Sequence, residues 1–170
     1  METPTYLQSC TPSTTSTTCS TPHHFNSGDS YWKIAAELQY RSRCFVEALN
    51  GRAFGRFSQL VGPEHIDTNF TAYLDNSTLD LGWDEFVSVL RDAAEADPEY
   101  HADIINQSVD LDEREGHATV FMFIEVTGRP KSVRREDALV FEWKTLEGTW
   151  MCYGHTAIRG ASGVRIAEHG

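Results

Sequence analysis

The segment "WDEFVSVLRDAAEADP" (residues 83–98) and the four segments that follow it decide the fold. Its apolar residues recur at helical spacing and form one face, and Asp97-Pro98 ends the helix. They are Trp83, Phe86, Val87, Leu90, Ala93 and Ala94. The next segments have the length of long strands and are separated by turn-forming clusters. They are Tyr100–Asp110, His117–Thr127, Val133–Lys144 and Thr149–Arg159. This order predicts a curved antiparallel sheet with a helix across it, which can enclose a pocket.

The chain before this region predicts further helices and one short strand. A long first helix begins near Ser30 and ends at Asn50-Gly51. Its buried stripe consists of Tyr31, Ile34, Leu38, Phe45 and Leu49. A short second helix places Ala53, Phe54, Phe57, Leu60 and Val61 on one face. The segment "NFTAYL" (residues 69–74) is a candidate edge strand. Helices early and an antiparallel sheet late define an α+β domain over residues 31–160.

The two ends of the chain are predicted to lie outside this domain. Residues 1–30 are rich in Ser, Thr and Pro and contain almost nothing to bury, so we expect a disordered tail. Residues 161–170 form a short C-terminal tail.

Composition limits the function classes. The 170 residues are enough for one domain, and the formal net charge is −11. An acidic chain without a basic cluster is a poor match for nucleic acid or for anionic membranes. The one basic run, "GRPKSVRR" (residues 128–135), is expected to be a solvated hairpin loop.

No segment has the apolar length of a membrane span, and the N-terminus lacks the features of a signal peptide, so we expect a cytoplasmic protein. The four cysteines are Cys10, Cys19, Cys44 and Cys152, and none has the spacing of a metal site. Cys44 and Cys152 are expected to be small buried apolar residues. We expect neither a metal nor an organic cofactor.

The order of elements, the "LNGRAF" turn (residues 49–54) and the ending "EWKTLEGTWMCYGHTAIRG" (residues 142–160) resemble the nuclear transport factor 2-like superfamily. Within it, the chain is most similar to SnoaL-like proteins, including small fungal ones associated with secondary metabolism. The resemblance implies a cone-shaped curved sheet with three helices from the N-terminal half, whose concave interior is the ligand site. The superfamily includes polyketide cyclases, scytalone dehydratase, ketosteroid isomerase, limonene epoxide hydrolase and proteins without catalysis.

Strand alternation assigns the faces of the sheet. In the segment His117–Thr127, every second residue from Ala118 to Val126 is apolar, and we place this set inward. The opposite set, which includes His117, Phe121, Phe123 and Glu125, then lies on the outer face. Exposed Phe121 and Phe123 would be covered by a subunit interface, and related proteins often dimerise through this face. We therefore expect a homodimer.

The same alternation supplies candidate site residues. If the chosen parity of each strand points inward, the pocket holds His101, Asp103, Asp137, Tyr153 and His155. The inward sets also contain Gln107, Val109, Arg135, Met151 and Ala157. A few polar groups in an apolar pocket suit proton transfer next to a carbonyl group, with one group removing the proton and another donating to the oxygen. His101 is the leading acid/base, since alignment with scytalone dehydratase places it where that family has a catalytic histidine. His155 or Tyr153 is expected to face the substrate oxygen, and Asp103 and Asp137 are expected to hold or charge the histidines.

Each candidate also has a structural alternative. His101 and Asp103 could be a hydrogen-bonded pair, His155 could bond Asp137 or the backbone, and Tyr153 could be a core residue. Asp137 could pair with Arg134 or Arg135 near the start of its strand. Asn50 stands near the place of an acid in the dehydratase-type site, and an asparagine does not titrate.

Two functions remain open at this point. The first is a cofactor-free acid/base enzyme, an isomerase, cyclase or dehydratase, acting on a hydrophobic polyketide- or terpenoid-like intermediate. The second is a non-catalytic module of the same fold that binds a small molecule or dimerises. An enzyme needs two titratable groups near one bound atom, whereas a binding module needs shape and one polar anchor.

Overall fold

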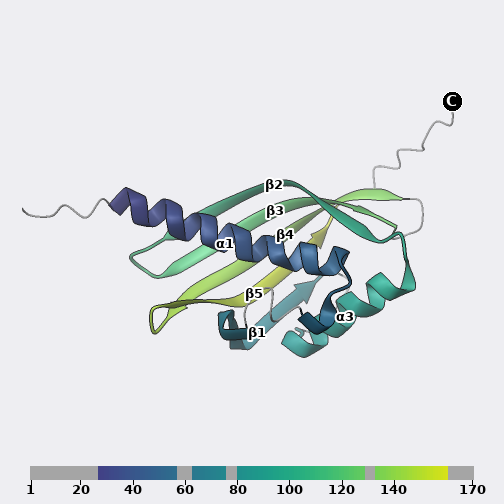
Figure 1. Cartoon of the computed structure of the whole chain (residues 1–170), viewed down its shortest axis with the longest axis horizontal. Helices are drawn as coiled ribbons and strands as arrows, with labels where there is room; N and C mark the ends of the chain where they lie inside the picture. The colour runs from purple at the N-terminus through teal and green to yellow at the C-terminus, as the bar shows by residue number, and fades with distance from the viewer. Residues whose placement is uncertain (1–26, 57–62, 76–79, 129–132, 161–170) are drawn as a thin grey trace, which may run out of the picture.

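A curved five-stranded sheet with a long helix lying across it forms the body of the molecule (Figure 1). The computed structural model describes residues 27–56, 63–75, 80–128 and 133–160. Its helices are α1 (Ser27–Asn50), α3 (Trp83–Ala96) and two short 3-10 helices at Phe54–Arg56 and Pro63–His65. Its strands are β1 (Ile66–Leu74), β2 (His101–Asp112), β3 (His117–Thr127), β4 (Arg134–Leu146) and β5 (Thr149–Arg159). The predicted tails lie largely outside the described residues, and so does the remainder of the predicted second helix beyond Arg56.

The sheet is mixed rather than purely antiparallel. Its strand order is β1-β5-β4-β3-β2, and β1 runs parallel to β5, whereas the other neighbours are antiparallel. β1 is an edge strand, as the sequence predicted. Because β1 pairs with the last strand of the meander, β5 lies inside the sheet with a neighbour on each side.

The hydrophobic core lies between the helices and the inner face of the sheet. The predicted inward set of β3, from Ala118 to Val126, is buried. Phe45 of α1 and Phe86 of α3 pack in the same core, as do Phe141 and Trp143 of β4. Trp143 is fully buried, and its Nε1 donates a hydrogen bond to Ser42 Oγ of α1 at 3.2 Å. The outer face keeps Phe121 and Phe123 exposed, as predicted.

Two β-bulges change which side chains face inward. In β2 the pairing with β3 skips Ile105, so Ala102 and Ile104 face inward before the bulge and Gln107 and Val109 face inward after it. In β5 the pairing with β4 skips Tyr153 in the same way. A bulge adds one residue to one strand, so the alternation is reversed beyond it.

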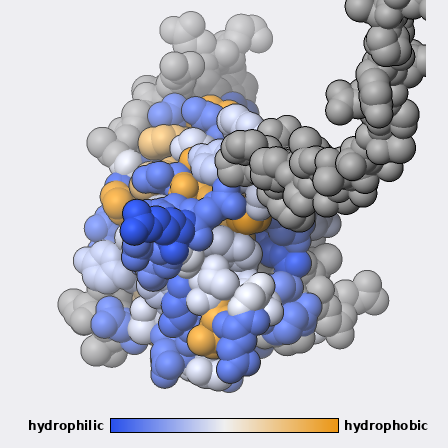
Figure 2. Space-filling view, turned by 90° about the vertical axis from the view of Figure 1, so that its left-hand side faces the viewer, coloured by the Kyte–Doolittle hydropathy of each residue, from blue (hydrophilic) through white to orange (hydrophobic). Residues whose placement is uncertain are grey.

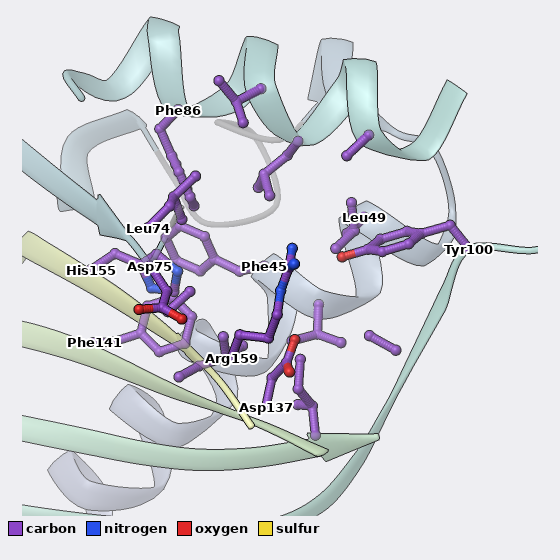
Figure 3. Close-up of a pocket in the computed structure, with 18 of the residues that line it drawn as sticks. Phe45, Leu49, Leu74, Asp75, Phe86, Tyr100, Asp137, Phe141, His155 and Arg159 are labelled. Carbon is purple, nitrogen blue, oxygen red and sulfur yellow. The ribbon is translucent and has the colours of Figure 1, made fainter. Parts of the chain in front are cut away.

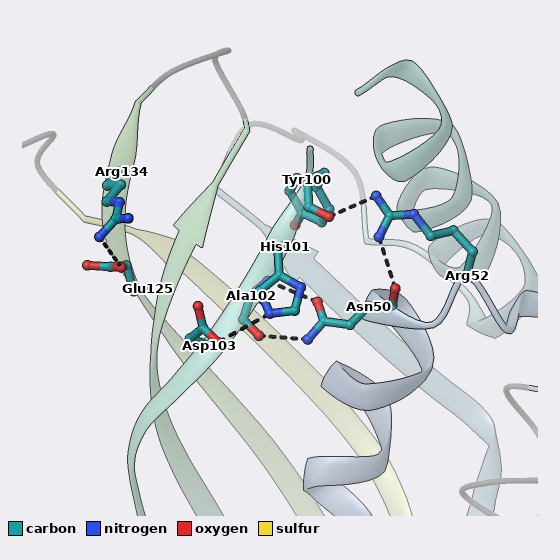
Figure 4. Close-up of polar contacts among 8 residues, drawn as sticks. All are labelled: Asn50, Arg52, Tyr100, His101, Ala102, Asp103, Glu125 and Arg134. Carbon is teal, nitrogen blue, oxygen red and sulfur yellow. Dashed lines mark hydrogen bonds and ion pairs between the residues drawn. The ribbon is translucent and has the colours of Figure 1, made fainter. Parts of the chain in front are cut away.

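Asn50, the last residue of α1, and Arg52, just after it, hold the start of β2 in place (Figure 4). The side-chain amide of Asn50 donates to the carbonyl oxygen of Ala102 at 2.8 Å and accepts from the backbone N–H of Ala102 at 2.9 Å. The guanidinium of Arg52 donates to the carbonyl oxygens of Asn50, Pro98 and Tyr100 at 2.8 to 3.0 Å. Asn50 therefore has a structural partner in the backbone and joins α1 to the sheet.

The end of the molecule that carries the β2–β3 and β4–β5 turns is mainly hydrophilic, with apolar residues scattered over it (Figure 2). Among the described residues, neither helix combines the length and the apolar character needed to cross a membrane.

Candidate functional site

A pocket of about 250 Å³ lies between α1, α3 and the inner face of the sheet (Figure 3). This volume is just below the range of roughly 300–1,000 Å³ found for small-molecule sites. Helix α1 contributes Phe45, Val46 and Leu49, because these positions fall on its buried stripe. Helix α3 contributes Phe86, Val89, Leu90 and Ala93. The sheet contributes Ala102, Ile124, Leu139, Phe141 and Ala157, so the walls are mainly apolar.

A buried ion pair forms one polar group of the pocket. Arg135 and Asp137 are two residues apart on β4, so both side chains point inward. Arg135 Nε donates to both carboxylate oxygens of Asp137 at 2.9 Å. The backbone N–H of Gly160 donates to Asp137 Oδ1 at 3.2 Å. The carboxylate is therefore oriented by three hydrogen bonds, and the predicted pairing of Asp137 with an arginine is confirmed with Arg135. The prediction of a solvated loop is wrong for Arg135, since this side chain is buried.

His155 is a second polar group in the wall of the pocket. It is 5% exposed, and its ring lies between the rings of Phe86 and Phe141, with centroid distances of 4.9 and 4.5 Å. Burial lowers the pKa of His155 to about 3, although a hydrogen bond with the backbone of Val140 acts in the opposite direction. The imidazole is therefore neutral near pH 7, which makes it a weak base but a usable hydrogen-bond partner.

Three further polar residues line the pocket that the sequence did not single out. They are Asp75, at the end of β1, Tyr100, before β2, and Arg159, at the end of β5. In Figure 3, Asp75 lies on the side of His155, Tyr100 lies on the opposite side, and Arg159 lies between them near Asp137. The register places Arg159 directly beside Asp137, and Asp75 N–H bonds the carbonyl of Ala157. The position of Arg159 beside Asp137 depends on how β4 and β5 pair in the assembled sheet. A sequence analysis could have placed Arg159 in the pocket only by predicting this pairing.

His101 and Asp103 do not face the pocket, so their predicted placement is wrong. The two side chains are 49% and 64% exposed, and His101 Nε2 lies 3.2 Å from Asp103 Oδ1 (Figure 4). In the sheet they lie beside Thr127 and Glu125, which belong to the outer set of β3. The bulge at Ile105 is the physical reason, because the chosen parity is inward at Gln107 and Val109 but outward at His101 and Asp103. The paired-histidine constellation is thus divided between the two faces of the sheet.

Tyr153 does not face the pocket either, because it is the extra residue of the bulge in β5. Its ring lies 5.1 Å from Lys144 Nζ and 6.4 Å from the ring of His117, both on the outer side of the sheet. Partial burial raises the pKa of the Tyr153 hydroxyl. Lys144 also pairs with Asp67, and this hydrogen bond lowers the pKa of Asp67. Met151, two residues earlier, pairs with Lys144 and therefore shares the outer face. The core role considered for Tyr153 is also wrong.

The two predicted candidates that remain, Asp137 and His155, lie at different levels of the pocket. In the ladder Asp137 is opposite Arg159 and Phe141 is opposite His155. Four residues of strand separate the two levels, which corresponds to about 13 Å along β4. This separation between backbone positions favours contacts of the two groups with different ends of one small molecule over contacts with a single bound atom.

No protein-family model and no curated protein matches the sequence. Solved structures do match the fold. A nuclear transport factor 2-like protein of unknown function from Pseudomonas putida is 9% identical, with a TM-score of 0.60 over 75% of this chain and 87% of the other. The hexachlorocyclohexane dehydrochlorinase LinA-type3 from Novosphingobium barchaimii is 9% identical, with a TM-score of 0.64 over 85% and 97%. The association domain of C. elegans CaMKII is 16% identical, with a TM-score of 0.55 over 78% and 99%.

These likenesses establish the fold. The chain has the nuclear transport factor 2-like fold, an α+β arrangement in which helices cover the inner face of a curved sheet. The expectation derived from the resemblance is confirmed at this level. Sequence identities this low do not carry a function from these proteins to the chain.

Proposed function

We propose that this protein binds a small, largely apolar molecule in the pocket between α1, α3 and the sheet. The observation that supports this is a pocket with mainly apolar walls and a few polar side chains, among which the Arg135–Asp137 pair and His155 lie at separate levels. Such a site gains affinity from burying an apolar frame and gains orientation from a few polar contacts. The separation of about 13 Å favours contacts at two ends of one ligand.

The test uses indene, an apolar two-ring probe, and follows binding by NMR shifts of pocket residues. Ala93→Trp places a large side chain into the pocket from α3, because Ala93 is buried and lines it. Ala96→Trp is the matched control, since Ala96 is an exposed position on the same helix. Wild type and the control should bind indene with similar affinity, and Ala93→Trp should lose at least about tenfold. Binding that is unaffected by Ala93→Trp contradicts the proposal.

A second candidate function is cofactor-free acid/base catalysis, as an isomerase, cyclase or dehydratase, on a polyketide- or terpenoid-like intermediate. It is favoured by the buried carboxylate of Asp137 at the edge of an apolar space, and the matched fold also occurs in a dehydrochlorinase. The proton acceptor of this candidate is Asp137, since His101 lies outside the pocket and His155 is a weak base. Turnover of such an intermediate that Asp137→Asn abolishes, with ligand binding retained, would place the enzyme ahead of the binding protein.

A further inference from the structure

His155 carries a polar atom that the fold leaves without a partner. Among buried side-chain nitrogens and oxygens of the described residues, Nδ1 of His155 makes no hydrogen bond. The ring is held between Phe86 and Phe141, and it lines the pocket. Buried polar atoms in folded proteins nearly always have a partner, and each exception calls for an explanation.

The state of the second ring nitrogen determines what Nδ1 offers. A neutral imidazole has one N–H donor and one bare acceptor nitrogen. The hydrogen bond with the backbone of Val140 favours the protonated form of the ring, so the ring donates to this backbone. Since Nδ1 is the atom without a partner, the donor is Nε2. Nδ1 therefore carries a bare lone pair, in a side chain that forms part of the pocket wall.

We propose that Nδ1 of His155 accepts a hydrogen bond from the ligand, so that the pocket selects apolar molecules that carry one hydroxyl or N–H donor at the end beside Phe86 and Phe141. The inference rests on the proposed binding function and names the chemistry of its ligand. An apolar molecule without a donor can fill the same space but leaves Nδ1 buried and unpaired. A binding site of this kind discriminates strongly against analogues that lack the matching group.

Indole and indene test this selectivity, because they have nearly the same shape and only indole has an N–H donor. Calorimetry gives the ratio of their affinities in wild type and in His155→Phe, where an aromatic ring without an acceptor replaces the imidazole. Wild type should bind indole at least as tightly as indene, and the variant should favour indene. We expect the ratio of the two affinities to change by about tenfold between the proteins. His155→Leu serves as a second variant without an acceptor.

Each outcome separates the two proposals. If the ratio of indole affinity to indene affinity is the same in wild type and variants, the role of Nδ1 is overturned. Binding of indene by the wild type would still support the proposed binding function of the pocket. Failure of wild type to bind either probe overturns the proposed function and this inference together. If neither variant folds, the NMR signal of Nδ1 in wild type decides, because it should shift on addition of indole and not on addition of indene. An equal shift with both probes overturns the inference.

Discussion

The surroundings of His155 couple its protonation to folding. Burial lowers its pKa from 6.5 to about 3 in the folded protein, whereas the unfolded chain keeps the ordinary value. Between these pH values the unfolded chain binds one proton more than the folded protein. The free energy of unfolding therefore decreases as the pH falls from about 6.5 toward 3, by up to about 1.4 kcal/mol per pH unit. Above about pH 6.5, His155 is neutral in both the folded and the unfolded chain, so it no longer makes the free energy of unfolding depend on pH.

Denaturation in urea from about pH 7 to about pH 4 measures this effect. His155→Phe should show a weaker dependence of unfolding free energy on pH than wild type, because the variant lacks the group that titrates in the unfolded chain. Other groups titrate in both proteins and cancel in the comparison. Equal slopes in the two proteins would mean that the folded protein protonates His155 at its ordinary pKa.

At the scale of elements, the alternation of apolar and polar residues correctly predicted which side chains face inward in the strands that have no bulge over these residues. β3 has an unbroken apolar set and β4 keeps one parity over its inward residues, so the inward positions of Asp137 and Phe141 could be predicted. β2 and β5 each contain one extra residue, and no local feature of the sequence marks Ile105 as that residue, whereas Gly154, next to Tyr153, is a glycine inside a strand and is typical of a bulge. The faces on which His101 and Tyr153 lie depend on how each strand pairs with its neighbour. Alternation within a single strand carries no information about this pairing.

Arg52 connects the end of α1 to the segment before β2, and the backbone conformation of Arg52 leads to a specific prediction. Arg52 has φ of 51°, a left-handed conformation that favours glycine. Arg52→Ala and Arg52→Gly both remove the guanidinium bonds to the carbonyl oxygens of Pro98 and Tyr100. Both variants should be less stable than wild type, and the glycine variant should exceed the alanine variant by about 1 kcal/mol.

Thermal unfolding of the three proteins checks this order. Arg91, an exposed arginine on α3, offers a comparison, since Arg91→Ala and Arg91→Gly fall within a helix. There glycine should be the less stable of the two variants. The same order at both positions would contradict the role assigned to the backbone of Arg52.

At the scale of the whole molecule, apolar residues gather on the outer face of the sheet. The ladder places Phe123 beside Ala138 and Phe121 beside Val140, while Ile158 lies on the other side of Ala138. Phe121, Phe123 and Ile158 are 42%, 53% and 50% exposed. A second copy of the chain related by a two-fold axis would cover this patch with the same patch. We therefore propose a homodimer built on this face.

Phe123→Lys should shift the particle toward monomer in sedimentation, since each copy would bring a charge into the apolar patch that the dimer buries. Trp32→Lys is the matched control, because Trp32 is 71% exposed on α1 and lies away from the patch. The control should keep the mass of wild type. A wild type that sediments as a monomer at high concentration would contradict the dimer.

The parallel pairing of β1 with β5 has a consequence for the order in which the structure assembles. The ring of His65, just before β1, bonds the carbonyl oxygen of Trp150, 85 positions away. Closing so long a loop costs chain entropy before contacts between its ends form. The hairpins from β2 to β5 join strands that are neighbours in the sequence, so their entropy cost is smaller. The antiparallel strands β2 to β5 can thus form early, whereas β1 can join the sheet only after β5 has formed. Since β1 ends at Leu74 and is followed by Asp75, both in the pocket wall, we expect the wall of the pocket to be completed in the final stage of folding.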